Sequence, residues 1–423
     1  MLHSALRNSS KAQVSTIITR SFATEVPSTS TTSESTLLPP KHPTDSGSNK
    51  PRPSRLYPSP RPASPRTHPV LTHLPPTFGR NQFLPVSNST RALLESIVAE
   101  FNAPIRYAFA YGSGVFEQAG YSQTKDPRDP DSPMLDFMFA VTHPDHFHSI
   151  NMHQHPSHYT LHARLFGSDY VSRVQALGPG VWFNAYVPMK GVTIKYGVTT
   201  VDNLCSDLLN WKSLYLAGRM HKPLRIIKDD ARVRLTQQVN LTSAVRAALL
   251  SLPSEFEERE LFERITGISY TGDPRMVLPA ENRGKIGNIV RNQQPQFREL
   301  YHRLVVALPG VHWPSHSGLI KQDTSALARS AHLRKLPSNL LTKVTGRFTE
   351  FQEMRKEDEN GFWVKLAEDS SKLNGVLNEE MTRIVRTPAT IQSIKGIVSA
   401  GVGKSLRYSA AKVGKWWKGS GGQ

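Results

Sequence analysis

Cysteine, long apolar runs and acidic residues are all scarce in this sequence, and each scarcity excludes a class of protein. The only cysteine, Cys205, excludes an intrachain disulfide and a multi-cysteine zinc site. No apolar run approaches the roughly 18 residues needed to span a bilayer, so any membrane contact is expected to be peripheral. The sequence contains 34 acidic residues and 52 Lys and Arg, which gives a net charge of +18. This charge favours polyanionic partners: nucleic acid, nucleotides or an anionic membrane surface.

The N-terminus lacks acidic residues before Glu25 and carries Arg7, Lys11 and Arg20 among many hydroxyl side chains. This composition is typical of a mitochondrial transit peptide, and the run RSFA at 20–23 predicts cleavage after Phe22. The alternative is a basic tail of no consequence. Residues 23–86 are dense in Pro, Ser, Thr and Arg, so we expect a disordered linker after a transit peptide at 1–22.

A small-residue turn follows the first predicted strand. The pattern predicts a helix over Asn88–Phe101 and a strand over Arg106–Ala110. The turn that follows consists of Tyr111, Gly112, Ser113 and Gly114. Glycines allow a tight turn that exposes backbone N–H groups, and before a helix such groups bind phosphate. The spacing is neither a Walker motif nor a dinucleotide fingerprint, and an ordinary loop is the alternative.

The next predicted strand, residues 134–141, is apolar almost throughout but contains Asp136. Such a strand is expected to be buried on both faces, where an unpaired carboxylate is costly. Asp136 therefore lies at a solvent-facing strand end, pairs with a cation or binds a metal. Mg²⁺ takes oxygen ligands, often one or two carboxylates together with substrate phosphates. A Gly-Ser turn followed by a carboxylate on the adjacent strand is the core of the nucleotidyltransferase fold.

These motifs and others in the same order resemble the mitochondrial phosphatidate cytidylyltransferases, the CDP-diacylglycerol synthases of the translocator-assembly-and-maintenance type. The matching segments are YGSGVF (111–116), MLDFMFAV (134–141), FHSINM (147–152), SHY (157–159), GVWFN (180–184), KYGV (195–198), DLLNW (207–211), YLAGRMHKP (215–223), ISYTGDPRM (268–276) and IKGIVSAG (394–401). The resemblance implies transfer of CMP from CTP to phosphatidic acid, giving CDP-diacylglycerol and pyrophosphate for phosphatidylglycerol and cardiolipin synthesis. It also implies Mg²⁺ and a peripheral place on the matrix side of the mitochondrial inner membrane.

The resemblance also implies a fold of the α/β (α+β) class. A nucleotidyltransferase catalytic domain is expected at 87–232, a mainly helical winged-helix-like domain at 233–380, and a C-terminal amphipathic helix. In the second domain, helices are predicted over Ser243–Leu252, Glu258–Ile265 and Phe297–Leu308, with a turn and a strand at 268–278. Asp273 is a candidate to complete the active site, although a turn before Pro274 is the simpler interpretation.

Asp136 is the predicted catalytic residue and metal ligand. Residues 134 and 138 are both methionine, so a second carboxylate two positions away is absent. A second ligand would come from Asp129, Asp131 or Asp207, or one metal ion suffices. Lys195, on a predicted strand at 192–198, is the second candidate catalytic residue, because a lysine there neutralises phosphate charge. A solvated edge-strand lysine is the alternative.

Further nucleotide contacts are expected around these residues. The predicted nucleotide-binding residues are Tyr111, Gly112, Ser113, Gly114, Tyr196, Arg219 and Lys222. A helix is predicted over Asp202–Ala217, with Arg219 and Lys222 at its end. Seven histidines crowd residues 143–162, and a zinc site among them is a weaker alternative. Four residues of this region fall in the family motifs and are candidates to line a nucleotide or lipid pocket: His148, Asn151, His158 and Tyr159.

The C-terminal segment has no acidic residue after Glu380. Apolar residues recur there at mainly helical spacing, which predicts a basic amphipathic helix at 388–418 that lies in an anionic membrane interface. The predicted membrane-binding residues are Lys395, Lys404, Arg407, Lys412, Lys415, Trp416 and Trp417. The alternative is a helix packed on the protein core.

Two other functions remain open from the residues alone. An RNA-directed terminal nucleotidyltransferase of mitochondria would share the fold and the basic charge. The sequence contains no recognisable RNA-binding module, so no nucleic-acid partner is expected. A non-catalytic assembly factor is suggested by the missing second carboxylate, but Asp136 and the Gly-Ser turn argue against it.

Overall fold

The computed structural model of the chain describes residues 74–75, 77–112, 114–116, 134–277 and 284–400. The predicted transit peptide, most of the predicted linker and the tail beyond Ala400 lie outside these residues. The linker prediction is wrong at its C-terminal end. Asn81 donates to the carbonyl of Leu300 at 2.8 Å, and Leu84 is buried, so the folded part begins before residue 87.

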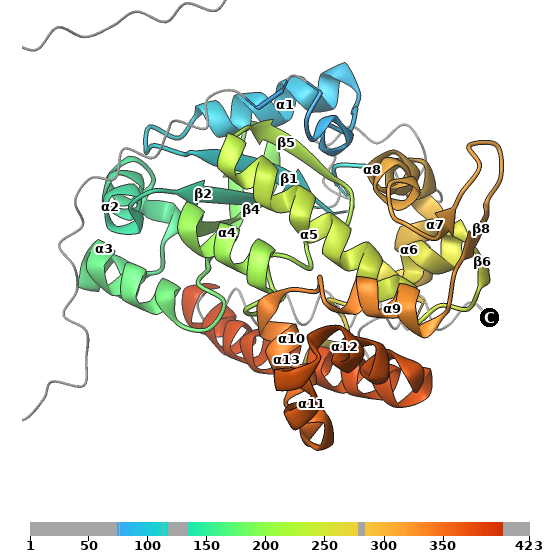
Figure 1. Cartoon of the computed structure of the whole chain (residues 1–423). Coiled ribbons are helices and arrows are strands. Elements are labelled where there is room, and N and C mark those ends of the chain that lie inside the picture. Colours follow the sequence, from blue (N-terminus) through green and yellow to red (C-terminus); the bar gives the residue numbers. More distant parts are fainter. Residues whose placement is uncertain (1–73, 76, 113, 117–133, 278–283, 401–423) are drawn as a thin grey trace, which may run out of the picture. The chain divides into compact units, whose positions relative to one another are not determined.

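A five-stranded mixed sheet forms the centre of the first half of the described chain (Figure 1). Its strands run in the order β3-β4-β2-β1-β5, with β2 and β4 parallel and the other neighbours antiparallel. The strands are β1 (Tyr107–Tyr111), β2 (Leu135–Val141), β3 (Trp182–Met189), β4 (Val192–Thr200) and β5 (Leu224–Lys228). The strands predicted near β1, β2 and β4 are confirmed, whereas β3 and β5 were not predicted.

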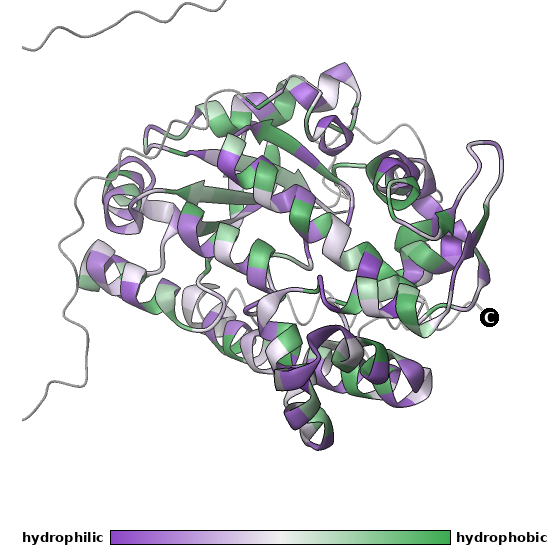
Figure 2. Ribbon diagram, in the orientation of Figure 1, coloured by the Kyte–Doolittle hydropathy of each residue, from purple (hydrophilic) through white to green (hydrophobic). Residues whose placement is uncertain are grey.

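Helices cover both faces of this sheet, which explains why β2 is apolar apart from Asp136 (Figure 2). On one face, α1 (Asn88–Ala99) and α2 (Pro144–Gln154) pack on a layer that contains Phe137 and Phe139. On the other, α4 (Val201–Asn210) and α5 (Ala231–Leu249) pack on Phe109 and Met138. The expected α/β (α+β) class is confirmed, and so is the helix predicted at 88–101.

The helix predicted over Asp202–Ala217 is wrong in its second half. α4 ends at Asn210, and Trp211 takes a left-handed backbone conformation with φ of 52°. The physical reason is Asp207, a buried carboxylate that accepts hydrogen bonds from the loop that follows the helix. Its donors are the backbone N–H groups of Ser213, Leu214, Leu216 and Ala217 and the Ser213 hydroxyl, at 2.6–3.1 Å. A continued helix would leave this buried charge without these donors.

The remaining chain is mainly helical, with one small sheet. Its α-helices are α3 (Leu161–Ala176), α6 (Glu258–Gly267), α7 (Lys285–Asn292), α8 (Gln294–Val306), α9 (Ala326–Leu333), α10 (Ser338–Thr345), α11 (Gln352–Glu357), α12 (Glu359–Glu368) and α13 (Ser370–Ala400). Short 3₁₀ helices occupy Arg80–Gln82, Pro156–His158, Pro274–Val277 and Thr349–Phe351. The small sheet has the order β6 (Glu255–Glu257), β8 (Leu319–Gln322), β7 (Val311–His312).

The helices predicted at 258–265 and 297–308 are confirmed, and the one predicted at 243–252 is the second half of α5. The strand predicted within 268–278 is wrong, because the described residues there form turns and a 3₁₀ helix. The predicted boundary between residues 232 and 233 falls inside α5. A single apolar cluster extends from Phe109 in the sheet to Ala389 in α13, so the two predicted domains share one core.

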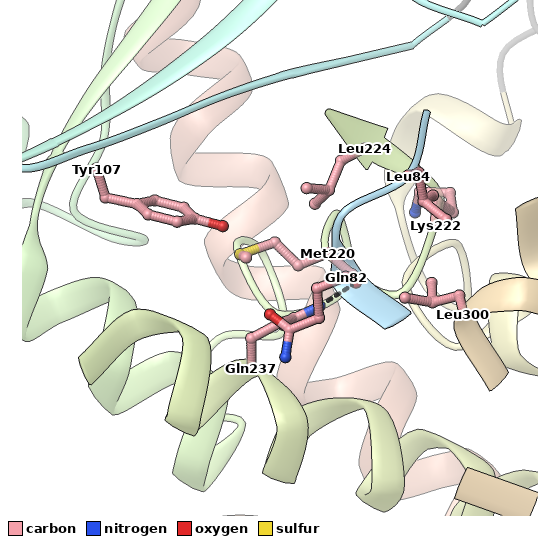
Figure 3. Close-up of a pocket in the computed structure, with 8 residues that line it drawn as sticks. All are labelled: Gln82, Leu84, Tyr107, Met220, Lys222, Leu224, Gln237 and Leu300. Atoms are coloured by element: carbon pink, nitrogen blue, oxygen red, sulfur yellow. Dashed lines mark hydrogen bonds between the residues drawn. The ribbon is translucent and has the colours of Figure 1, made fainter. Parts of the chain in front are cut away.

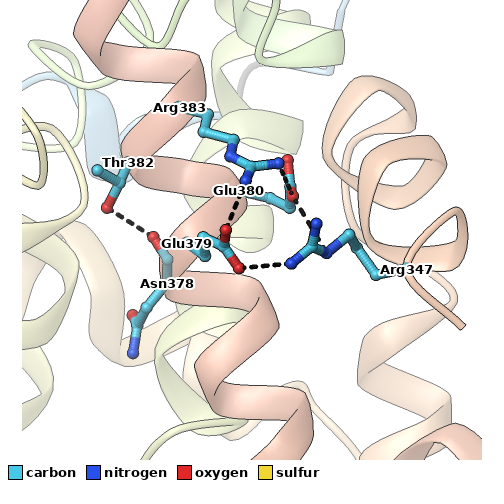
Figure 4. Close-up of polar contacts among 6 residues, drawn as sticks. All are labelled: Arg347, Asn378, Glu379, Glu380, Thr382 and Arg383. Atoms are coloured by element: carbon cyan, nitrogen blue, oxygen red, sulfur yellow. Dashed lines mark hydrogen bonds and ion pairs between the residues drawn. The ribbon is translucent and has the colours of Figure 1, made fainter.

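Helix α13 is held at two places along its length. Near its middle, Arg347 reaches Glu379 at 2.9 Å, and Arg383 pairs with Glu379 and Glu380 (Figure 4). Near its end, the Lys395 ammonium donates to the backbone carbonyls of Gln175 at 3.0 Å and Leu177 at 2.8 Å. This second anchor attaches α13 to the C-terminal end of α3.

The prediction that Lys395 contacts a membrane is therefore wrong. Its side chain is buried, and burial lowers the pKa of its ammonium to about 8. The alternative of a helix packed on the protein core is correct for Ala389, Gln392, Lys395 and Ser399, which are buried, whereas Ile394 is exposed. The other predicted membrane-binding residues, Lys404, Arg407, Lys412, Lys415, Trp416 and Trp417, lie outside the described residues. No helix in the described part of the chain has both the length and the apolar character needed to cross a bilayer.

Candidate active site

Tyr111, Asp136 and Lys195 form one row across three neighbouring strands. Tyr111 is paired with Asp136 between β1 and β2, and Asp136 with Lys195 between β2 and β4. Directly paired residues point to the same face of a sheet, so the three side chains lie together. Nζ of Lys195 is 3.3 Å from Oδ1 of Asp136, and each side chain is about a quarter exposed, 28% and 26%. Burial, and then the Asp136 carboxylate, raise the pKa of the Tyr111 phenol.

Gly112 brings the backbone close to this pair. Its φ is +88°, and a Cβ atom there would lie 3.3 Å from Oδ2 of Asp136. The N–H of Val115 donates to its carbonyl at 3.3 Å, which closes the turn. The predicted turn therefore adjoins the predicted carboxylate, with Gly114 in it. Ser113 and the segment 117–133, where a following helix would begin, lie outside the described residues.

The described part of the site presents a second cation, Arg219. Its guanidinium carbon lies 3.8 Å from the centre of the Tyr215 ring, 5.9 Å from Tyr111 and 6.0 Å from Phe183. Lys195 lies over the same Phe183 ring at 4.8 Å. Two cations therefore flank one aromatic side chain beside the Asp136 carboxylate. The predicted role of Arg219 as a phosphate contact fits this position.

Tyr196 does not share this face, because successive residues of a strand point to opposite sides. It is fully buried among the α1 and α2 side chains. Its hydroxyl accepts from Asn151 and from Asn184, each at 2.8 Å, and contacts Nδ1 of His158 at 2.9 Å. The prediction that Tyr196 contacts the nucleotide is therefore wrong. Its buried hydrogen bonds instead hold β4 in place on the side of the sheet opposite Lys195.

The histidine-rich segment contributes to this support. His148 is buried and contacts the Tyr159 hydroxyl and the Gln175 side-chain oxygen, each at 2.8 Å. Burial lowers the pKa of His148 to about 4, so the ring is neutral at physiological pH. Within the described ranges, no three His, Cys, Asp or Glu side chains are grouped as a metal site requires. The pocket-lining role considered for His148, Asn151, His158 and Tyr159 is wrong, because they form a buried hydrogen-bonded cluster.

Lys222 is not brought to Asp136 by any contact in the described structure. Its ammonium donates to the Gly218 carbonyl at 2.6 Å and to the Ser269 hydroxyl at 2.8 Å. It also lines a cavity of about 10 Å³ between Tyr107 and Leu300 (Figure 3). That volume accommodates one water molecule and no nucleotide. We therefore assign Lys222 to the junction of the two halves of the chain and not to the phosphate site.

The other candidate carboxylates do not join Asp136. Asp207 is saturated by the loop described above and has no capacity for a metal ion. Asp273 is buried, and its carbonyl accepts from the Met276 N–H at 3.0 Å, as expected of a turn. Asp129 and Asp131 lie outside the described residues. Oδ1 of Asp136 is buried and forms the ion pair with the Lys195 ammonium at 3.3 Å, so this oxygen is already placed beside a cation.

Substituting Gly112 with alanine should weaken CTP binding. The side chain would impose strain at a positive φ and press on the Asp136 carboxylate, and small misplacements of reacting groups are costly, so we expect a loss of about tenfold or more in CTP affinity. Isothermal titration with CTP measures it. Gly167→Ala is the matched control, because Gly167 has a φ of +79° and nothing within 4 Å of its Cβ position. Equal CTP affinity in the two variants would refute the placement of the phosphates at this turn.

Sequence reasoning missed two aromatic residues of the site. Phe183 lies on β3, a strand that was not predicted, and Tyr215 falls within the helix predicted over Asp202–Ala217, whose second half is wrong. The only signal available was the presence of both in family motifs, GVWFN and YLAGRMHKP.

Comparison with known proteins identifies the family of this chain. The sequence profile of the family described as mitochondrial phosphatidate cytidylyltransferase matches residues 94–415. A protein of that name from Xenopus laevis is 38% identical over 335 residues, which cover 78% of this chain and 96% of the relative. The one from Saccharomyces cerevisiae is 33% identical over 343 residues, 80% of this chain and 74% of the relative. The chain therefore belongs to the mitochondrial phosphatidate cytidylyltransferase family.

Proposed function

We propose that this protein transfers a cytidylyl group from CTP to phosphatidic acid, giving CDP-diacylglycerol and pyrophosphate. The observation that carries the proposal is the Asp136–Lys195 pair beside the Gly112 turn, in a chain of this family. The RNA-directed alternative has no support, since the matched relatives reported above carry the name phosphatidate cytidylyltransferase. A non-catalytic assembly factor would not require an Asp–Lys ion pair beside a glycine turn.

The reaction needs charge neutralisation more than covalent chemistry from the protein. A phosphate oxygen of phosphatidic acid attacks the α-phosphorus of CTP, the bond to the β-phosphate breaks, and pyrophosphate leaves with the electron pair. Nucleophile and leaving group are both anionic, so fixed positive charge lowers the barrier. Lys195 and Arg219 supply it, and the backbone at Gly112 lets the phosphates approach closely. Phe183 and Tyr215 hold both cations in place and keep water from their apolar sides.

We further propose that Asp136 holds a Mg²⁺ ion together with the substrate phosphates. The Asp136 carboxylate, already placed beside one cation, fits a hard metal ion, and one carboxylate with substrate oxygens is a common magnesium environment. When bound, the ion would neutralise phosphate charge and polarise the phosphoryl oxygens. Lys195 lies 3.3 Å from Oδ1 of Asp136 and would share the phosphate charge with the ion.

The relatives are named mitochondrial, and we propose the matrix side of the inner membrane as the location of this chain, with peripheral attachment. The acid-free N-terminus and the cationic C-terminal tail support this proposal. The direct test of the function uses purified protein from residue 23 onward, labelled CTP, phosphatidic acid in anionic vesicles and Mg²⁺. Formation of labelled CDP-diacylglycerol supports the proposal, and labelled RNA ends formed instead would establish the alternative.

Removing residues 401–423 should abolish use of phosphatidic acid in vesicles while leaving CTP binding unchanged. The truncation keeps α13 to its end, including the Lys395 anchor, whereas a truncation at residue 388 would remove buried side chains and damage the fold. The tail carries Trp416 and Trp417 and five Lys and Arg residues. Flotation with anionic vesicles measures membrane binding, which should decrease as salt increases. If the truncated protein floats and turns over normally, the tail has no membrane role.

A further inference from the structure

Large apolar side chains are exposed with unusual density on and around α3. Twelve such side chains are exposed in the described part of the chain, and four of them belong to α3 and the residue after it. Leu161, Leu165 and Phe166 are 64%, 74% and 68% exposed, and Leu177 is 57% exposed. Contiguous exposed apolar surface on a soluble domain marks a binding site for a protein or a membrane.

The first turns of α3 are built so that these side chains face outward. Within residues 161–166, Ala163 is the residue that is fully buried. The segment is therefore anchored in the core by a small side chain. Gly167, with φ of +79°, then interrupts the helix and separates residues 161–166 from the rest of α3. The result is a short helical segment whose large residues contribute little to the core.

The other end of α3 leads to the tail that we propose binds lipid. The Gln175 and Leu177 carbonyls hold Lys395, and a Cβ atom on Gly178 would be 2.6 Å from Ile391, so α13 is in direct contact with this end (Figure 1). Ile394, between these contacts, is 60% exposed, which adds a second exposed apolar residue at the Leu177 end of α3. Five residues after Lys395, α13 ends at Ala400, and the cationic tail begins.

We propose that Leu161, Leu165 and Phe166, continued by Leu177 and Ile394, form a membrane-docking surface of the folded protein that contacts the bilayer beside the tail. The inference rests on the proposed function, because a lipid substrate brings the protein to a bilayer. The surrounding charge agrees with an anionic bilayer, since Arg164 and Arg386 are exposed and Asp169, the acidic residue of α3, is paired with Arg173 at 2.8 Å. Anchoring at two sites, one polybasic and one apolar, gives stable binding where either alone is marginal.

The test compares two triple variants of the full-length mature protein. Leu161→Ser/Leu165→Ser/Phe166→Ser removes the apolar surface. Val239→Ser/Val306→Ser/Leu327→Ser is the matched control, because these side chains are 43%, 43% and 72% exposed on other helices. Flotation uses phosphatidylcholine–phosphatidylglycerol vesicles at high salt, where binding by the tail charges is screened. We expect the α3 variant to bind at least about tenfold more weakly than the control, because interfacial binding scales with buried apolar area.

Activity with a short-chain, water-soluble phosphatidic acid separates this inference from the proposed function. Both variants should use that substrate at the wild-type rate, and only the α3 variant should lose activity with phosphatidic acid in vesicles. If wild-type protein makes CDP-diacylglycerol neither from the soluble substrate nor from phosphatidic acid in vesicles, the proposed function fails, and the flotation result still decides the docking surface. Equal flotation of the two triple variants would overturn the inference.

A label provides a positive signal and detects another occupant. The one native cysteine, Cys205, is buried, so a polarity-sensitive thiol dye on a Leu165→Cys variant reports from α3 alone. Its emission should shift to the blue when vesicles are added, and the same dye on Leu327→Cys should not respond. Absence of a shift while the protein floats would refute insertion of α3. A wild-type dimer without lipid that the α3 substitutions convert to monomer would show that a second copy of the chain covers this surface, and would also overturn the inference.

Discussion

Asp136→Asn should abolish turnover, with a loss of at least about 10³-fold in kcat, the range found for groups that stabilise charge in phosphoryl transfer. The substitution keeps the shape of the side chain and removes its negative charge. The chain would lose both its proposed magnesium ligand and the partner that holds Lys195 at 3.3 Å. Because the pair is about a quarter exposed, the free energy of unfolding should change by about 1 kcal/mol or less.

The measurement is kcat over a Mg²⁺ titration, with thermal unfolding followed in parallel. Asp202→Asn is the matched control, since Asp202 forms an ion pair with Arg232 at the surface, away from the Gly112 turn. The control should retain wild-type kcat. Near-normal turnover of the Asp136 variant at any Mg²⁺ concentration would show that this carboxylate is not a ligand.

Lys195→Met should reduce kcat by about 10²- to 10³-fold, which is typical when one preorganised charge-stabilising group is removed. Methionine keeps the apolar contact with Phe183 and deletes the ammonium group. CTP affinity should decrease less than kcat, because charge shifts toward the leaving group only in the transition state. Lys195→Arg keeps the charge in a larger planar group and should give intermediate activity.

Lys190→Met is the control for this series. Lys190 lies at the turn between β3 and β4, where it forms an ion pair with Glu100, so the substitution removes a charge from the same hairpin outside the site. Single-turnover kinetics with bound CTP isolates the chemical step. An unchanged single-turnover rate in Lys195→Met would show that Lys195 has no catalytic role and that the alternative, a solvated strand lysine, is correct.

The centre of the site could be predicted from sequence because its signals are local. A run of apolar residues with one carboxylate predicts a buried strand. Glycines between two strands predict a turn with a backbone conformation that other residues adopt only at a cost in free energy. Asp136 and Gly112 were therefore identified together, and the structure places them in contact. The cationic side of the site could be predicted only in part, because the sequence indicated Lys195 and Arg219 but not their aromatic neighbours.

The errors arose where a residue's partner is distant in the chain. The pattern of Leu204, Leu208, Trp211 and Tyr215 continues a helix, yet the buried Asp207 carboxylate binds the backbone of the following loop and ends the helix at Asn210. Lys395 matched a membrane-binding pattern, yet two carbonyls more than 200 positions earlier in the chain bury it.

By itself, the sequence determined the family, the strand that bears Asp136, the glycine turn and the cationic tail, because these depend on residue type and short spacing. Only the tertiary structure shows which side of the sheet carries the candidate active site. Lys195 and Tyr196 must point in opposite directions, but both sides of β4 are covered, so alternation cannot identify the catalytic side. The decision comes from the loop after α4, which brings Tyr215 and Arg219 over Lys195, while Asn151, His158 and Asn184 close the other side around Tyr196.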